Sequence, residues 1–319
     1  MPQERDPQPG DPLIVAIDGG GTRTRAWLAS IGIPNTNTNT DAEPFRVLGK
    51  GQTRGSNAGS VGVGPSSSAI TEALRGAFID AGLRERRVQA CVAAIAGTSD
   101  EPVRAALERS LSDARIAERL TVTDDVSPVL LAGLDELGRR SIEPVYPVVV
   151  LASGTGSIAR GFGADGERCR AGGLGPAAGD PGSGYAIGRA VLDAGLESLD
   201  ASATKHNDNT QAEPASVARF ARVAIDRYAD HRACQSLVDR AADDLAALVA
   251  QATGQLTHDT RGPITLVTTG GVLTGSRVVC DLVLSRLDRA GCRVAHHVAV
   301  PDPVRGALHM AARAAADLG

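Results

Sequence analysis

Three glycine-rich segments of this chain have the composition of phosphate-binding turns. They are Asp18-Gly-Gly-Gly-Thr22, Ser153-Gly-Thr-Gly156 and Thr268-Thr-Gly-Gly271, and each follows a short apolar run. A backbone without Cβ atoms lets several N–H groups approach phosphate oxygens together. The first segment is neither a Walker P-loop nor a dinucleotide fingerprint, because no Gly-Lys-Ser/Thr is present and a strand follows it. A hairpin turn explains one such segment alone, whereas the ordered set of three predicts a nucleotide site.

Carboxylates at the ends of expected strands supply the rest of the chemistry. Asp18 ends the first apolar run, and an acidic group beside a phosphate site implies a cation between them, normally Mg²⁺. Asp124 and Asp125 end the run from Leu120, and one carboxylate there can accept the proton of a hydroxyl that attacks a phosphate. Alternatively, either aspartate caps a helix that begins near Ser127. These residues predict phosphoryl transfer.

The stretch from Ala171 to Tyr185 is too rich in glycine for regular structure and contains one carboxylate, Asp180. A flexible linker is one interpretation. Linkers rarely combine a leucine, a tyrosine and a single aspartate with so many glycines, and a helix start is expected at Ser183. A binding loop is therefore the other interpretation.

The elements that position these groups follow a pattern that occurs twice: a strand, a Gly/Thr-rich turn and a second strand, with further strands and helices behind them. Strands are expected at 13–17, 24–30, 45–51, 88–96, 120–125, 148–151, 157–162, 264–269 and 293–300, and a polar exposed loop at 34–43. Helices are expected at 66–81, from 100, near 183–198, 214–229, 231–253 and 276–290, and at 303–318. The pattern predicts an α/β fold with two similar domains that face each other.

Composition excludes several classes of protein. The 319 residues fit two domains, and 33 Lys and Arg against 37 Asp and Glu give a net charge of −4 without a basic run that would attract nucleic acid. No apolar stretch reaches the roughly 18 residues of a membrane helix, and the N-terminus has no apolar signal core. The five cysteines form no CxxC pair and the six histidines no metal-binding pattern. We expect a cytoplasmic enzyme.

These segments resemble the sugar-kinase, Hsp70 and actin superfold, and within it the N-acetylglucosamine kinase-like branch of the BadF/BadG/BcrA/BcrD ATPase family. The matching segments, in the family's order, are Ile17–Thr22, Gly55–Asn57, Ala96–Gly97, Val122–Asp125, Ala152–Ser157, Gly172–Gly184 and Thr269–Val272. The resemblance implies two actin-like or hexokinase-like (ribonuclease H-like) domains around a nucleotide cleft. Residues 13–140 with 303–319 would form the first domain and 141–302 the second, after a flexible tail at 1–12.

The resemblance also implies residue roles in moving the γ-phosphate of ATP to the 6-hydroxyl of an amino sugar. Asp125 would be the catalytic base, and Asp18 would hold the Mg²⁺ environment. ATP would be bound by Gly20, Gly21, Thr22, Arg23, Gly154, Thr155, Gly156, Gly270 and Gly271, and the sugar by Asn57, Gly97, Asp124, Asp125, Gly173 and Asp180. The expected partner is a small sugar, with N-acetylglucosamine first, and a homodimer is one expected assembly because relatives are often dimers.

Three positions depart from the family's pattern. Leu174 stands where the family usually has Trp, Pro181 where it has Glu, and Asp124 where it has Asn or Thr. The first two lie beside the implied sugar pocket, and a carboxylate at 124 would suit a free amine better than an acetamide. Glucosamine or another hexose is therefore an alternative substrate.

Two other classes of function stay open. One is a sugar or nucleotide sensor that lacks catalysis. The other is an ATPase that activates a 2-hydroxyacyl-CoA dehydratase through an iron–sulfur cluster shared by a dimer, which needs two thiolates from each subunit. Cys169 is the one cysteine near a glycine-rich stretch, and it has no partner at suitable spacing.

Overall fold

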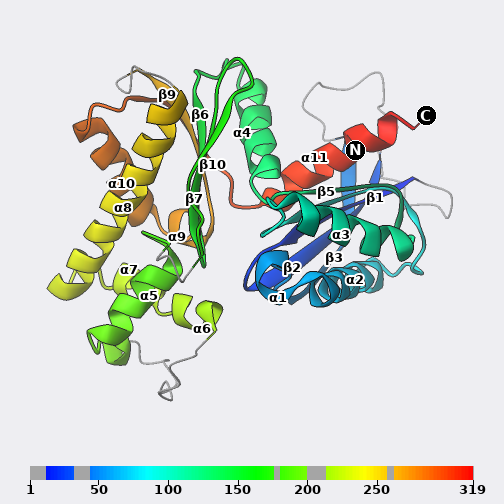
Figure 1. Cartoon of the computed structure of the whole chain (residues 1–319), viewed down its shortest axis with the longest axis horizontal. Helices are drawn as coiled ribbons and strands as arrows, with labels where there is room; N and C mark the ends of the chain where they lie inside the picture. The colour runs from blue at the N-terminus through cyan, green and yellow to red at the C-terminus, as the bar shows by residue number, and fades with distance from the viewer. Residues whose placement is uncertain (1–11, 32–43, 176–179, 200–212, 257–261, 319) are drawn as a thin grey trace, which may run out of the picture. The chain divides into compact units, whose positions relative to one another are not determined.

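The computed structural model of this chain describes residues 12–31, 44–175, 180–199, 213–256 and 262–318. They form two compact units (Figure 1). Unit 1 consists of Met1–Ala132 and Asp302–Gly319, and unit 2 of Gly133–Pro301, whereas we expected boundaries at 140 and 302. The first boundary falls inside helix α4 (Ser127–Arg139), because Gly133 of this helix already packs on Val267 of unit 2. The expected tail at 1–12, apart from Pro12, and the expected loop at 34–43 lie outside the described residues.

Unit 1 is built on a five-stranded sheet in the order β3-β2-β1-β4-β5. Its strands are β1 (Leu13–Gly19), β2 (Arg23–Ile31), β3 (Phe45–Arg54), β4 (Val88–Ile95) and β5 (Ala117–Thr123). β2 pairs antiparallel with both β1 and β3, whereas β4 and β5 continue the sheet parallel to β1. The carboxyl ends of β1, β4 and β5 therefore meet at one edge, where α/β sheets usually bind ligands.

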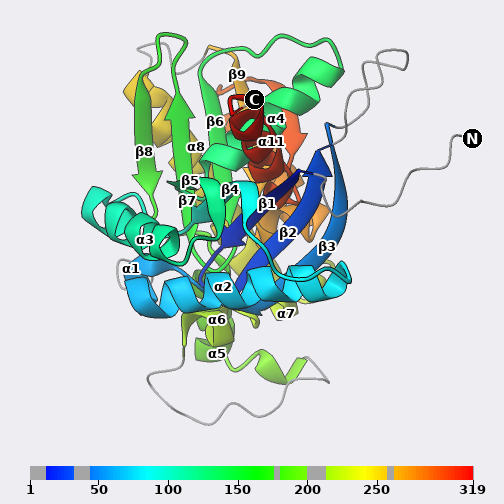
Figure 2. The same ribbon diagram turned by 90° about the vertical axis from the view of Figure 1, so that its right-hand side faces the viewer.

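Helices cover both faces of the unit 1 sheet. Helices α2 (Val63–Asp80) and α3 (Glu101–Asp113) lie on one face and α11 (Pro303–Ala316) on the other (Figure 1), and Figure 2 shows α2 running across the strands. Alternate residues of a strand point to opposite faces, so Ile17 joins the core beneath α2 while Ala16 joins the core beneath α11. Burial on both faces explains why β1 is a continuous apolar run.

Unit 2 repeats the topology of unit 1. Its strands are β6 (Val148–Ser153), β7 (Ser157–Phe162), β8 (Arg168–Gly172), β9 (Ile264–Thr269) and β10 (Val294–Ala299), in the order β10-β9-β6-β7-β8. β7 pairs antiparallel with both β6 and β8, and β9 and β10 continue the sheet parallel to β6. The strands of the two units correspond one to one in chain order and direction, which confirms the expected α/β fold with two similar domains.

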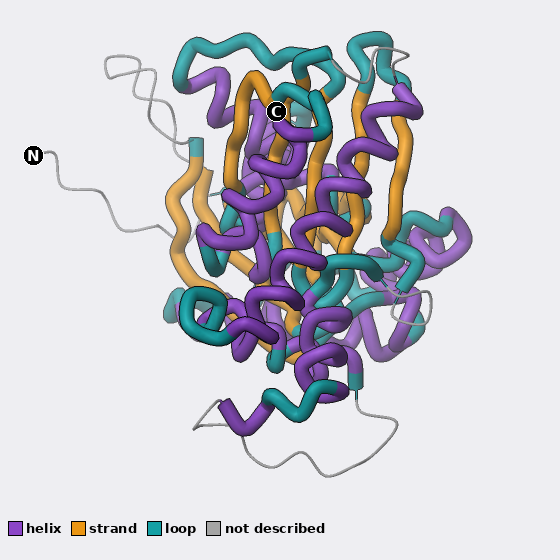
Figure 3. The backbone as a smooth tube through the Cα atoms, turned by 90° about the vertical axis from the view of Figure 1, so that its left-hand side faces the viewer, coloured by secondary structure: helices purple, strands orange, loops and turns teal. Residues whose placement is uncertain are grey.

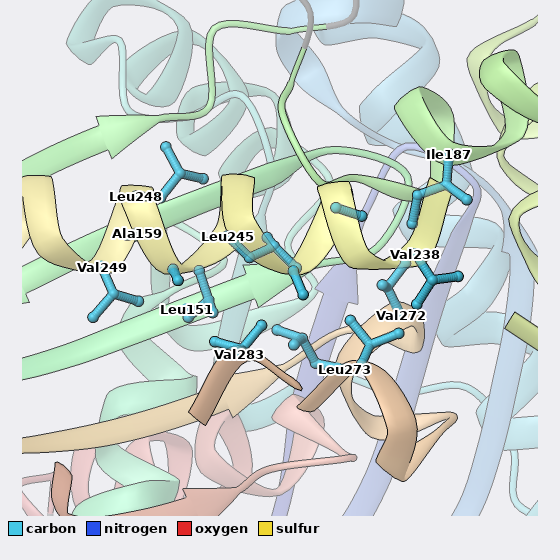
Figure 4. Packing of buried hydrophobic residues seen from close by; sticks show 14 of the residues in the cluster. Leu151, Ala159, Ile187, Val238, Leu245, Leu248, Val249, Val272, Leu273 and Val283 are labelled. Carbon is cyan, nitrogen blue, oxygen red and sulfur yellow. The ribbon is translucent and has the colours of Figure 1, made fainter. Parts of the chain in front are cut away.

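The core of unit 2 is aliphatic, as a chain with few aromatic residues requires. Its helices are α5 (Gly184–Asp193), the 3₁₀ helix η2 (Glu197–Leu199), α6 (Pro214–Ala218), α7 (Ala221–Asp226), α8 (Arg232–Leu256), α9 (Gly271–Thr274) and α10 (Arg277–Arg289). In Figure 3 helices of this unit lie in front of its strands. Leu245 of α8 packs with Leu151 of β6 and Val283 of α10 in one buried cluster (Figure 4). This cluster fixes the strand ends that carry the turns described below.

Some elements differ from the sequence-based expectation. Strand β8 was not expected, because it is short, Arg168 and Arg170 are exposed and charged, and Ala171 is its one buried residue. The helix expected at 214–229 is divided into α6 and α7 around Arg219 and Phe220, and the short helices α1 (Ala58–Val61) and α9 were not expected. None of the described helices is both long and apolar enough to span a membrane.

Candidate functional site

The β1–β2 turn of unit 1 is held by its own backbone. The Gly20 amide donates to the Arg23 carbonyl at 3.0 Å, and the Gly20 carbonyl accepts from the amides of Ser56 and Asn57 at 3.0 and 3.1 Å. The buried Thr24 hydroxyl donates to the carbonyl of Arg54 at 2.7 Å and lies 2.8 Å from the Ser56 hydroxyl, which ties the turn to the end of β3. The turn is therefore a rigid part of the sheet edge.

Not every glycine of this turn is explained by packing. A Cβ on Gly19 would lie 2.1 Å from the Ser56 Oγ, so close packing alone requires glycine there. A Cβ on Gly21, in contrast, would meet no atom within 4 Å. Gly21, Thr22 and Arg23 are exposed. These three residues form the open part of the turn, which a ligand can approach.

Asn57 and Gly97, both expected at a sugar site, lie side by side. The Asn57 Oδ1 accepts from the Gly59 amide at 3.1 Å and so caps α1. Gly97 has a φ of +81°, and a Cβ there would lie 2.4 Å from the Asn57 Oδ1. The Ala58 amide donates to the Ala96 carbonyl, and the Ala96 amide to the Gly19 carbonyl. The ends of β1 and β4 are thus joined to the start of α1.

The two adjacent aspartates after β5 have different surroundings. The Asp124 Oδ1 accepts from the amides of Val126 and Ser127, and its Oδ2 accepts from the Ser127 hydroxyl, each at 3.0 Å. Asp124 therefore caps α4, as the alternative interpretation expected. Asp125 is half-buried at the same edge of the sheet. The Thr98 hydroxyl, which contacts the carbonyls of Ile95 and Thr123, holds the ends of β4 and β5 together.

Asp18 forms an ion pair that the sequence analysis did not identify. Its Oδ2 accepts from the Arg25 Nη2 at 2.8 Å and from the Arg25 Nε at 3.3 Å, and the Arg25 Nη1 donates to Asp302 at 2.7 Å. Both contacts of Arg25 with Asp18 fall on the Oδ2, so the Oδ1 takes no part in this ion pair. A carboxylate oxygen outside the ion pair and beside a phosphate-type turn fits a divalent cation held through water. Asp18 and Arg25 are opposite in the β1–β2 register, so their pairing could have been found from the hairpin alignment.

The β6–β7 turn of unit 2 is closed in a similar way. The Gly154 amide donates to the Gly156 carbonyl at 2.9 Å, and the Gly154 carbonyl accepts from the Gly184 amide at 2.7 Å. The hydroxyls of Ser153 and Ser157 donate to the carbonyls of Gly182 and Pro181. These hydroxyls hold the 181–184 segment against the turn, and Ser183 then caps α5 through the Ala186 amide.

Asp180, which was expected to bind the sugar, lies against the β6–β7 turn, whose residues were expected to bind ATP. Its side chain is buried, its φ is +27°, and its Oδ1 accepts from the Gly175 amide at 3.0 Å. A Cβ on Gly156 would lie 2.7 Å from the Asp180 Oδ2. Burial raises the pKa of the Asp180 carboxyl, although the hydrogen bond from Gly175 and the charge of Arg170 act against it. The described part of the glycine-rich stretch is thus a bonded loop rather than a linker, and its residues 176–179 lie outside the described ones.

The remaining expected residues of unit 2 are placed by close backbone contacts. Gly270 has a φ of +91°, and a Cβ there would lie 2.3 Å from the Ser153 carbonyl oxygen, so the third glycine-rich segment lies on the second. Gly271 begins α9, and a Cβ there would meet nothing within 4 Å. Gly173 has a φ of +67° and lies beside Ile158. Each segment expected to bind ATP in unit 2 therefore contains an open glycine and a packed one.

Comparisons with known proteins identify the family and the fold of this chain. The model of the BadF/BadG/BcrA/BcrD ATPase family matches residues 15–311. A curated relative, the N-acetylmuramic acid/N-acetylglucosamine kinase of Clostridium acetobutylicum, is 28% identical over 203 residues, which are 59% of this chain and 54% of the relative. The chain thus spans about half the length of that relative in the alignment.

Solved structures extend the likeness over almost the whole chain. A candidate N-acetylglucosamine kinase from Chromobacterium violaceum is 24% identical with a TM-score of 0.66, covering 95% of this chain and 99% of that one. A candidate N-acetylglucosamine kinase from Porphyromonas gingivalis is 19% identical with a TM-score of 0.67, covering 94% and 99%. These two establish the fold. Because the family model spans most of the residues, including both glycine-rich turns and Asp125, the chain belongs to the BadF/BadG/BcrA/BcrD ATPase family.

Proposed function

We propose that this protein is an ATP-dependent kinase that transfers the γ-phosphate to the 6-hydroxyl of an amino sugar, with N-acetylglucosamine as the first candidate. The observation that carries the proposal is the pair of aspartates after β5. Because capping of α4 occupies both oxygens of Asp124, Asp125 is the carboxylate of the pair that we assign to the chemistry. The name of the Clostridium acetobutylicum relative supports the class of substrate.

Asp125 is the proposed general base. It would accept the proton of the sugar hydroxyl as that hydroxyl attacks the γ-phosphate. Phosphoryl transfer depends mainly on positioning and on neutralising charge, so one oriented carboxylate is sufficient for the proton. The rigid attachment of the strand ends by Thr98 keeps the backbone before Asp125 in place.

The glycine-rich turns are the proposed ATP-binding segments. In unit 1 we assign phosphate contact to Gly21, Thr22 and Arg23 ahead of the Gly20 amide, which already donates to Arg23. In unit 2 we assign it to Gly154, Thr155 and Gly156, with Gly270 and Gly271 against the adenosine. A bound Mg²⁺ would neutralise phosphate charge, and Asp18 would hold it through water.

The sugar site is proposed at Asn57, Gly97, Gly173 and Asp180, together with Asp125. Asp124 caps α4, so the reason to prefer a free amine over an acetamide no longer applies. Leu174, at the position where the family usually has Trp, is 73% exposed. Because the curated relative's name includes N-acetylmuramic acid, that sugar is a candidate alongside N-acetylglucosamine.

The positions of the cysteines favour a kinase over an activator with an iron–sulfur cluster. Cys91, Cys234 and Cys280 are buried in β4, α8 and α10, Cys292 is buried between α10 and β10, and the Cys169 Sγ contacts the Ala252 carbonyl. A cluster would need paired, accessible thiolates. The cytoplasmic location and the homodimer stay predictions.

A coupled ADP-release assay tests the proposal. The panel contains N-acetylglucosamine, N-acetylmuramic acid, glucosamine, glucose and a blank without sugar, each with ATP and Mg²⁺. We expect turnover that depends on an amino sugar and is low in the blank. Equal ADP release with and without sugar would make the protein an ATPase, and ATP binding without turnover would favour the sensor.

A further inference from the structure

Arg25 lies between two carboxylates that are far apart in the chain. On one side its Nη2 and Nε contact the Asp18 Oδ2, and on the other its Nη1 contacts the Asp302 Oδ1 at 2.7 Å. The Arg25 side chain is 14% exposed and that of Asp18 is 20% exposed, so both groups are largely shielded from solvent. Shielded ion pairs with a short, two-point contact fix geometry better than exposed pairs do.

The fold determines this arrangement. Asp18 and Arg25 are directly opposite on antiparallel strands, which brings their side chains together on one face of the sheet. Helix α11 packs its apolar residues on that same face, and Asp302 is its N-cap residue. Asp302 caps no backbone amide with its side chain, and its carboxylate contacts Arg25 instead.

Arg25 stays charged in this position. Burial acts to lower the pKa of its guanidinium, but the adjacent Asp18 and Asp302 outweigh this effect and raise the pKa overall. Without the guanidinium, the two carboxylates would lose the cation that lies between them, and each would lose its preferred orientation. A guanidinium is planar and donates from a rigid fork, so lysine supplies the charge without the same orientation.

We propose that Arg25 is a positioning residue for Asp18: it holds the Oδ2 and so leaves the Oδ1 for the hydration shell of a nucleotide-bound divalent cation. Asp302 holds the second arm of the guanidinium, which makes the start of α11 part of this support. The inference rests on the proposed function only in assigning Asp18 to the cation.

Binding of Mn²⁺ in the presence of ADP, followed by the electron paramagnetic resonance of free Mn²⁺, tests this without any sugar. Arg25→Met should weaken Mn²⁺ binding by about 10- to 100-fold, the usual effect of removing a residue that orients a ligand. Binding of ADP without a divalent ion should be unchanged, Arg25→Lys should recover part of the loss, and Asp302→Asn should lie between wild type and Arg25→Met.

Arg119→Met is the matched control, because Arg119 also joins the sheet to α11 but at the far end, through Ala314 and Asp317. It should leave Mn²⁺ binding unchanged. If Arg25→Met lowers the unfolding midpoint of the free protein but leaves Mn²⁺ binding at the wild-type value, Arg25 only attaches α11 and the proposal is wrong. A protein that binds Mn²⁺ and ADP as expected but phosphorylates no sugar would contradict the proposed function instead.

Discussion

Adjacent residues of the same type are assigned different roles at the carboxyl edge of the unit 1 sheet. Asp124 accepts three hydrogen bonds from Val126 and Ser127, so it stabilises the start of α4. Asp125 is the next residue, and it is the one that we assign to the chemistry. In the β1–β2 turn, the amide and carbonyl of Gly20 form backbone hydrogen bonds, whereas a Cβ on Gly21 would meet no atom within 4 Å. The proposed chemical roles thus fall one residue away from the structural ones.

The isosteric pair Asp124→Asn and Asp125→Asn tests this separation. Asparagine caps a helix about as well as aspartate, so Asp124→Asn should change stability by less than about 1 kcal/mol and leave kcat near the wild-type value. Asp125→Asn should lower kcat by about 10²- to 10⁴-fold, the usual contribution of a general base. Steady-state kinetics with the preferred sugar, together with thermal unfolding of both variants, provide the measurement. A larger loss of kcat in Asp124→Asn would reverse the assignment.

At the scale of elements, close backbone contact joins β3 to α2. A Cβ on Gly51 would lie 1.9 Å from the Ala73 carbonyl oxygen, and a Cβ on Gly49 would lie 2.3 Å from that of Ala77. Glycine within a strand often marks such a close approach. This contact holds α2 on the sheet whose edge carries the β1–β2 turn.

Gly51→Ala should therefore destabilise the protein. Forcing a methyl group against a helix backbone costs about 1–3 kcal/mol, because strand and helix must separate. Gly64→Ala is the matched control: Gly64 lies in α2 with open space around its Cβ position, and alanine there should be neutral or stabilise by up to about 1 kcal/mol. Chemical denaturation of both variants and of the wild type measures their stabilities. Equal unfolding midpoints would contradict the prediction, because they would show that β3 and α2 can separate enough for a methyl group at little cost.

The sequence predicted those features of the structure that depend on a few consecutive residues, and it did not predict those that depend on contacts between distant segments. Apolar runs such as Leu13–Ile17 and Val148–Leu151 predicted buried strands, and the alternative role of Asp124 as a cap was visible from its place before Ser127. Strand β8 and the division of α6 from α7 were not predicted, since they depend on packing that no local pattern records. The Arg25–Asp302 pair joins residues 277 positions apart, so only the folded sheet and α11 could show it.

At the scale of the whole molecule, the two units share a topology but not their chemistry. Both place a glycine-rich turn between their first and second strands. In unit 1 Asp18 is the penultimate residue of β1 and Asp124 and Asp125 follow β5, whereas in unit 2 Ala152 is the penultimate residue of β6 and Val300 and Pro301 follow β10. The duplication accounts for a glycine-rich turn in each unit, and the difference is why we place the proposed base and the proposed cation carboxylate in unit 1.

Phosphorus NMR of the products formed from ATP, Mg²⁺ and N-acetylglucosamine, with Asp125→Asn in parallel, would identify the hydroxyl that receives the phosphate. We expect a phosphomonoester whose phosphorus couples to the two protons on C6 of the sugar, formed by the wild type and nearly absent with the variant. Inorganic phosphate as the sole phosphorus product besides ADP, or a phosphorus coupled to the anomeric proton, would contradict it.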